Sequence, residues 1–203
     1  MLNFEDIQRY FWGSWRIMNG HADGLELFDL SEDGFWQSFQ AITVSLPPLI
    51  LSWIVFANDA VAFRPETGTR LSLIGRIAFV DLTAWVLPLV VLLFVAPRIG
   101  LRNRFSVYVI TSNWGSALVN WLVVPATLVH IFMPTRPQLS LGVDLVLNAV
   151  ALVLTYRLTH VALKKTYAYT TAFFAILVTG YIVLVVVLQS VLGIAMPEPV
   201  TLG

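Results

Sequence analysis

This chain has no cysteine and few charged residues. Without cysteine it can form no disulfide, no thiolate metal site and no cysteine nucleophile. Only 12% of its 203 residues are charged and 58% are hydrophobic, whereas an average soluble domain has roughly 25% charged residues. This composition predicts a protein whose main solvent is lipid.

An excess of charge of either sign is also missing. Twelve basic and twelve acidic residues give a formal net charge of zero, so no overall field attracts nucleic acid, and we expect no nucleic-acid partner. The N-terminal residues lack the basic region, apolar run and cleavage site of a signal peptide, since Glu5 and Asp6 precede Arg9. We therefore expect them to remain in the mature protein.

Motifs that carry chemistry are absent as well. The sequence has no phosphate-binding glycine loop, zinc-binding histidine pair or serine nucleophile elbow. His130 and His160 lie near opposite membrane faces and His21 lies outside the spans, so a haem held by two histidines is not expected. A single pigment ligand at His130 stays open. We expect no cofactor and no enzymatic activity.

Long apolar runs dominate what is present. A bilayer core about 30 Å thick needs about 20 mostly apolar residues per helix. Five runs qualify, at residues 34–57, 76–96, 105–133, 139–163 and 169–195. The sequence predicts an all-α, polytopic membrane helix bundle, with antiparallel neighbours because the connections are short. It divides into an acidic N-terminal segment (1–33), the bundle (34–196) and a short exposed tail (197–203).

The orientation follows from the basic residues, because Lys and Arg resist translocation. An N-terminus inside the cell puts seven of them in the cytoplasm and four outside. The seven are Arg9, Arg16, Arg98, Arg102, Arg104, Lys164 and Lys165, and the four are Arg64, Arg70, Arg76 and Arg136. The count favours an N-in, C-out arrangement.

The N-terminal segment is amphipathic. Its apolar residues fall three or four apart, as on one helical face, and Trp12 widens that face. The face consists of Phe4, Ile7, Phe11, Trp15 and Met18. We expect an interfacial helix, or alternatively one that packs on the bundle. Seven acids against two arginines predict that the segment docks on the basic loops around Arg102 and Lys164. Ser31 is expected to cap the first span.

Ionisable residues within the spans are candidate functional sites, because charge is costly in hydrocarbon. Asp81, Asp144 and His130 are expected at similar depth near the outer face. They could form a proton or cation site. Alternatively, the aspartates could form ion pairs, Asp81 with Arg76 and Asp144 with Arg136.

Two polar stripes are expected to meet between the third and fourth spans. One carries Asn113, Asn120 and Thr127, and the other carries Asp144, Asn148 and Thr155. The side chains of the two stripes could form interhelical hydrogen bonds, or they could line a transport path.

Prolines lie inside three spans and predict bent helices. They are Pro47, Pro48, Pro88 and Pro125. Thr43 and Ser45 are placed to satisfy the carbonyls that the paired prolines free.

Five spans behind an amphipathic N-terminal region resemble the layout of Yip1-domain membrane proteins. Residues 24–39, GLELFDLSEDGFWQSF, are similar to the start of small membrane proteins of bacteria, which implies a bacterial inner membrane. The first hypothesis is a non-enzymatic scaffold or accessory subunit that binds lipid and other membrane proteins or itself. The alternative is a small transporter or ion-coupled channel that works as an oligomer.

Overall fold

The regular structure of the chain is helical throughout the residues described, which are 3–63, 68–133 and 135–194 of a computed structural model. Five stretches are long and apolar enough to cross a membrane. They are Glu32–Phe63, Arg70–Val95, Arg102–Phe132, Gln138–Leu163 and Tyr167–Val191. The prediction of an all-α protein with five candidate membrane spans is confirmed.

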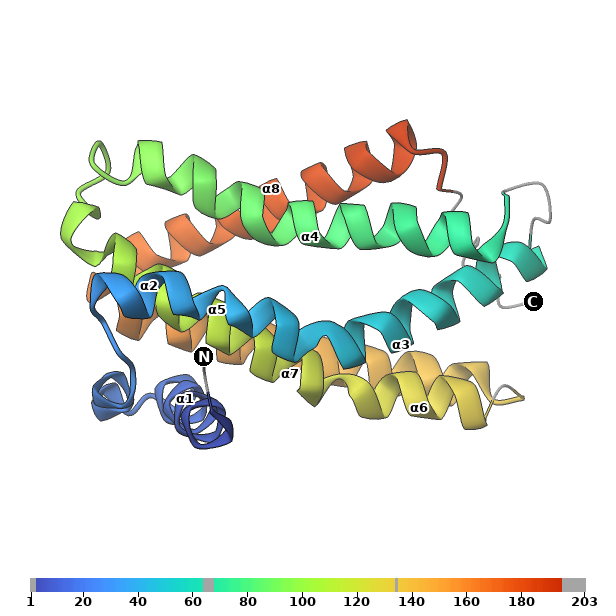
Figure 1. The fold of residues 1–203 in the computed structure, drawn as a ribbon, viewed down its shortest axis with the longest axis horizontal. Helices are drawn as coiled ribbons and strands as arrows, with labels where there is room; N and C mark the ends of the chain where they lie inside the picture. Colours follow the sequence, from blue (N-terminus) through green and yellow to red (C-terminus); the bar gives the residue numbers. More distant parts are fainter. Residues whose placement is uncertain (1–2, 64–67, 134, 195–203) are drawn as a thin grey trace.

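Consecutive spans run in opposite directions and form one bundle (Figure 1). The first span consists of α2 (Glu32–Ser38) and α3 (Gln40–Phe63), the second of α4 (Arg70–Val95), and the third of the short turn η3 (Arg102–Arg104) with α5 (Phe105–Leu122) and α6 (Val124–Phe132). The fourth is α7 (Pro137–Leu163) and the fifth is α8 (Tyr167–Val191).

The first two spans are longer than the sequence predicted. Helix α3 continues to Phe63 rather than ending near residue 57, and α4 begins at Arg70 rather than near residue 76. The N-cap of α4 is Thr69, whose hydroxyl accepts a hydrogen bond from the Ser72 amide at 3.2 Å. Polar residues that we expected in the loop therefore lie within helices, and Asp81 lies near the middle of α4.

The prolines bend or interrupt the helices as predicted at two places. Helix α5 ends at Leu122, and Pro125 stands in the first turn of α6, where a missing amide proton costs nothing. Pro47 and Pro48 lie inside α3, which changes direction partway along its length (Figure 1).

The carbonyl freed by Pro48 is satisfied by another helix. Pro48 has no amide proton to donate to Val44 O, and Trp121 Nε1 of α5 donates to that oxygen at 3.1 Å. The expectation that Ser45 would serve the freed carbonyls is wrong, because its hydroxyl donates to Ala41 O at 2.8 Å. The bend in α3 is thus tied to the third span.

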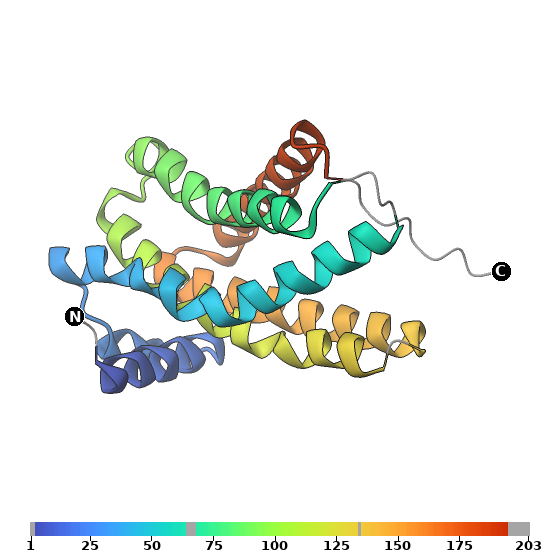
Figure 2. The ribbon, with the colours of Figure 1, turned by 45° about the vertical axis from the view of Figure 1, so that its right-hand side comes forward.

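Helix α1 (Phe4–Met18) and the short helix η1 (Ala22–Leu27) lie across the direction of the spans. Helix α1 is seen nearly end-on in Figure 1 and lengthwise beneath the bundle in Figure 2. It packs on α5 and α7, with Tyr10, Ile17 and Met18 buried in one cluster with Trp114 and Leu158. Of the two alternatives for this helix, packing on the bundle is therefore observed.

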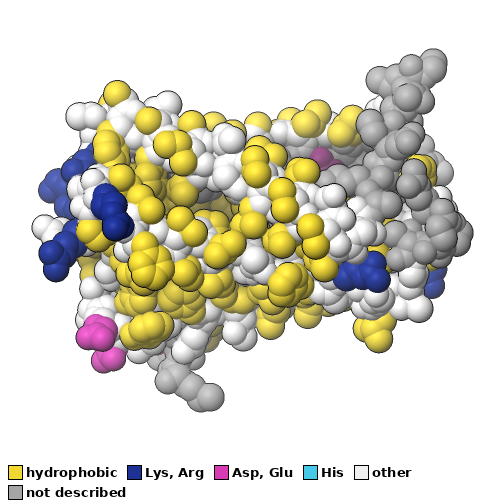
Figure 3. Space-filling model, turned by 90° about the horizontal axis from the view of Figure 1, so that it is seen from above, with side chains coloured by type: hydrophobic (Ala, Val, Ile, Leu, Met, Phe, Trp, Pro, Cys, Tyr) yellow, Lys and Arg dark blue, Asp and Glu magenta, His cyan; other side chains and the backbone are white. Residues whose placement is uncertain are grey.

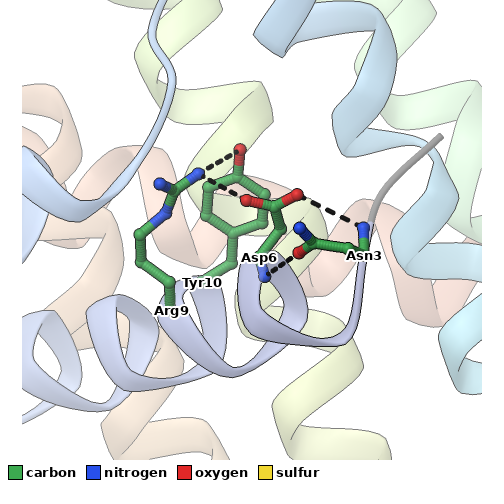
Figure 4. Close-up of polar contacts among 4 residues, drawn as sticks. All are labelled: Asn3, Asp6, Arg9 and Tyr10. Carbon is green, nitrogen blue, oxygen red and sulfur yellow. Dashed lines mark hydrogen bonds and ion pairs between the residues drawn. The ribbon is translucent and has the colours of Figure 1, made fainter.

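A capping box fixes the first turn of α1 (Figure 4). Asn3 Oδ1 accepts from the Asp6 amide at 2.7 Å, and the Asp6 carboxylate accepts from the Asn3 amide at 3.3 Å. Arg9 then donates to the same carboxylate at 2.9 Å and to the Tyr10 hydroxyl at 3.3 Å. These contacts connect the start of α1 to its buried face.

Candidate intramembrane polar site

Asp81 is the carboxylate nearest the middle of a span. It lies on α4 and accepts a 2.7 Å hydrogen bond from Trp53 Nε1 on α3. Arg76 instead donates to Leu192 O, just beyond α8, at 3.1 Å. The expected Asp81–Arg76 ion pair is therefore wrong, and each residue ties α4 to a different helix.

His130 belongs to a cluster of three helices at one end of the bundle. Its Nε2 lies 2.9 Å from Asp59 Oδ2 of α3, and its Nδ1 lies 3.4 Å from Ser140 Oγ of α7. Sequence reasoning missed Asp59 because it assigned this residue to the loop after the first span. Asp59 and His130 are 71 residues apart, so the contact could be predicted only if α3 were expected to continue to Phe63.

Asp144 and the two candidate asparagines do not join either contact. The Asn148 side chain donates to Asp144 O of its own helix at 2.8 Å. Within the described ranges, Asn120 makes no side-chain hydrogen bond, the Asp144–Arg136 ion pair is not formed, and no hydrogen bond or ion pair joins any two of Asp81, Asp144 and His130. Asp81, Asp144 and His130, which we predicted to form one site, are therefore not bonded to one another.

Asn113 makes the most buried polar contact between helices. Its Oδ1 accepts from Trp85 Nε1 of α4 at 3.0 Å, and its Nδ2 donates to Ser38 Oγ of α2 at 2.9 Å. Asn113 and Ser38 are almost completely buried. The expectation that this stripe faces the polar stripe of α7 is wrong for Asn113, which joins α5 to α2 and α4.

The hydrogen bonds made by the polar stripe of the fourth span also lie within one helix, α7. Thr155 donates to Ala151 O at 2.8 Å, four residues earlier. Small hydroxyl side chains in membrane helices commonly bond in this way, because the carbonyl one turn back is the nearest acceptor. This stripe therefore provides no continuous polar path among the residues described.

Two acids of the N-terminal segment, Asp6 and Asp23, pair with arginines of the same segment. Arg16 forms an ion pair with Asp23, and its hydrogen bonds hold the pKa of that carboxyl below its usual value. Hydrogen bonds from Ser31 likewise lower the pKa of Asp29. The expected docking on the basic loops is wrong for the described part of the chain, where no ion pair joins this segment to Arg102 or Lys164.

The aromatic residues of α1 divide between two faces. Ile7 and Phe11 are half-buried, and the Phe11 ring lies 6.2 Å from that of Trp114. Phe4, Trp12 and Trp15 remain exposed, by 71%, 56% and 41%. The buried face of α1 carries Tyr10, Gly13, Ser14, Ile17 and Met18, and at Gly13 a β carbon would lie 2.7 Å from the Phe28 ring and 3.1 Å from Gly24 O, so this glycine permits the close approach of the η1 segment.

The chemistry available is that of hydrogen bonds between helices. Among residues 3–63, 68–133 and 135–194, no three His, Asp or Glu side chains gather as a metal site would require. Comparisons with protein-family models, curated proteins and solved structures find no match to this chain. The resemblance to Yip1-domain proteins therefore gains no support from these comparisons, and the structure supports a membrane protein with five candidate spans.

Proposed function

We propose that this membrane protein is a non-enzymatic scaffold or accessory subunit of a membrane protein complex. One observation carries the proposal. Three separate polar contacts join helices within the bundle, Trp53 with Asp81, Asp59 with His130, and Asn113 with Trp85 and Ser38, whereas Asn148 and Thr155 bond within their own helix. Such contacts stabilise a helix bundle, whereas a transport path requires polar groups that continue across the membrane.

The surface offered to a partner is the outer side of α1. Phe4, Trp12 and Trp15 are exposed on α1, while Tyr10 and Ile17 hold α1 on the bundle; Trp36 is exposed separately on α2. Aromatic side chains are enriched at protein interfaces because they bury large areas at low entropic cost. A rigidly held aromatic helix suits attachment to another membrane protein at one membrane face.

The proposed setting is a bacterial inner membrane with the N-terminus in the cytoplasm. The resemblance of residues 24–39 supports the bacterial membrane, and the distribution of basic residues supports the orientation. The number and order of the spans support a Yip1-like architecture.

Native mass spectrometry of the complex extracted in mild detergent tests the proposal. The wild type should be found with a second membrane protein in fixed stoichiometry, and Trp12→Ala combined with Trp15→Ala should release it. Phe132→Ala is the matched control, because Phe132 is 76% exposed on α6 and should leave the complex intact. A homo-oligomer unaffected by either change would contradict the proposal.

A second candidate, an ion-coupled transporter acting as an oligomer, is favoured by the His130 cluster. The His130 and Asp59 side chains are 43% and 46% exposed, so ions in water could reach them. Flux in proteoliposomes that disappears in His130→Gln and in Asp59→Asn would favour this function. Flux equal to that of protein-free vesicles would eliminate it.

A further inference from the structure

An apolar groove lies between α4 and α8. It has a volume of about 440 Å³ and is lined by side chains such as Leu87, Val91 and Val95 of α4 and Leu177 and Leu184 of α8. Figure 3 views the face that these helices present, where hydrophobic side chains predominate. The groove therefore favours an occupant that is itself apolar.

The groove exists because two contacts fix α4 and α8 on either side of it while a glycine leaves space between them. Arg76 donates to Leu192 O at 3.1 Å at one end, and the Tyr169 hydroxyl donates to Ile99 O at 2.7 Å at the other. Gly180 lines the groove, and a β carbon at that position would meet no atom within 4 Å. The neighbouring packing thus leaves this space unfilled.

The length of the groove matches one acyl chain in one leaflet. Along α8 it extends from Phe173 to Leu184, which is about 16 Å at about 1.5 Å per residue. One leaflet is half of a core about 30 Å thick.

One end of the groove lies beside cations. Lys165 Nζ lies 5.6 Å from the centre of the Tyr169 ring, which stacks on the groove residue Phe173. Arg98 is the immediate neighbour of the groove residue Ile99, and one of its nitrogens donates to Phe94 O at 2.6 Å. The groove therefore ends at two positively charged groups.

These cations belong to a larger basic cluster at this end of the bundle. Arg98, Arg102, Arg104, Lys164 and Lys165 lie in the connections before α5 and before α8, and Figure 3 shows basic side chains gathered at that end. Within the described residues, none of the five forms an ion pair with a carboxylate. Their charge remains available to an anionic ligand.

We propose that the groove binds an anionic phospholipid, with one acyl chain along α4 and α8 and the phosphate against Arg98 and Lys165. Basic pockets between membrane helices are typical binding sites for anionic headgroups. The apolar part of the groove binds the acyl chain and its charged end binds the phosphate. Because this site is formed by α4 and α8, it is independent of the aromatic surface of α1.

The first experiment tests the acyl-chain part by native mass spectrometry of purified protein with added phosphatidylglycerol. The wild type should retain one lipid per chain. Gly180→Leu should lower retention roughly ten-fold, because displacing even two buried methylenes costs about that much affinity. Gly142→Leu on α7 is the matched control, since a β carbon there also meets no atom within 4 Å but Gly142 lies outside the groove.

The second experiment tests the headgroup part with phosphatidylcholine of the same acyl chains. Arg98→Gln and Lys165→Gln should each lower the affinity for phosphatidylglycerol about five-fold and leave phosphatidylcholine unchanged. Arg70→Gln, an exposed arginine at the other end of α4, should change neither lipid.

Three results would overturn the proposal. The first is wild-type retention of phosphatidylglycerol in Gly180→Leu, and the second is equal retention of the two lipids by the wild type. The third is a change of oligomeric state in Gly180→Leu with unaltered lipid retention, which would assign the groove to a second copy of the chain.

Discussion

Gly24 and Gly180 have opposite surroundings in this protein. A β carbon at Gly24 would lie 2.7 Å from Gly13 O and 2.9 Å from the Arg16 β carbon, whereas one at Gly180 would meet no atom within 4 Å. Gly24 belongs to η1, which packs on α1 where α1 docks on α5 and α7, and Gly180 belongs to the α4–α8 face. The same residue type allows close packing in one region and leaves a groove in the other.

The difference indicates where stability resides and where a ligand fits. The docked region buries Ile17, Met18, Trp114 and Leu158 almost completely, so it should respond strongly to changes of volume. The α4–α8 face has unfilled space, so it should tolerate added volume while losing the lipid that we propose.

Trp114→Ala should have the largest effect of the substitutions considered. Trp114 is 1% exposed and its ring lies 4.8 Å from that of Tyr10, so its loss should lower the free energy of unfolding by about 3–5 kcal/mol. Chemical denaturation in detergent measures this. Trp36→Ala, at a residue 66% exposed, should lower the free energy of unfolding by less than about 0.5 kcal/mol. Similar losses in the two variants would contradict the expected difference between the buried and the exposed tryptophan.

Gly24→Ala and Gly180→Ala compare the two regions directly. The first should cost about 1–3 kcal/mol because backbone and side-chain atoms must move. The second should leave the free energy of unfolding unchanged or raise it by up to about 1 kcal/mol, since alanine is the better helix former. Thermal unfolding of the pair checks the order, and a larger loss in Gly180→Ala would reverse our account of the packing.

Asn113→Leu tests whether the hydrogen bonds that join α5 to α2 and α4 add stability. The change leaves the Trp85 indole without its acceptor and removes the donor to Ser38, which keeps its bond to Phe35 O, and should cost about 1–2 kcal/mol. Asn120→Leu is the matched control because the structure gives the Asn120 side chain no hydrogen bond among the described residues. Equal denaturation midpoints for the two variants would show that the Asn113 contacts add no stability.

Asp59→Asn should have a smaller effect. The Asp59 and His130 side chains are nearly half exposed, and exposed ion pairs contribute roughly 0–1 kcal/mol. The free energy of unfolding, measured beside that of the wild type, should therefore fall by less than about 1 kcal/mol. A loss comparable to that of Trp114→Ala would place a second centre of stability at this end of the bundle.

Acid should weaken the α1–η1 connection only slightly. The Arg16 hydrogen bonds lower the pKa of Asp23 in the folded state from 3.8. The stabilisation is therefore complete above pH 3.8 and disappears as the pH falls through the lower, folded pKa. The protection factors of the α1 amides, which correct the exchange rates for their intrinsic dependence on pH, should fall below pH 3.8 in the wild type and be insensitive to this step in Asp23→Asn, whereas a transition near neutral pH would contradict this assignment.

The sequence predicted the spans but not most of the contacts between them. Apolar runs and Pro125 gave the five helical stretches and the break in the third, because both depend on local composition. The end of α3 was wrong because Asn58 and Asp59 resemble loop residues. Trp121 as the partner of Val44 O could not be foreseen, since indoles and freed carbonyls occur in several spans and only the packing selects the pair.

The amphipathic helix shows the same limit. Spacing identified Ile7, Phe11 and Met18, which do pack on the bundle, but not Tyr10, Gly13 and Ser14, which complete the buried face. Similarly, the groove depends on what surrounds Gly180, and the sequence alone does not show those surroundings.

Site-directed photo-crosslinking at position 12 in native membranes tests the scaffold most directly. A benzophenone side chain in place of Trp12 should give one adduct of a single mass, containing this chain and another membrane protein, while the same group in place of Phe132 should give none. Adducts at position 12 that contain only lipid or a second copy of the chain would contradict the proposed function.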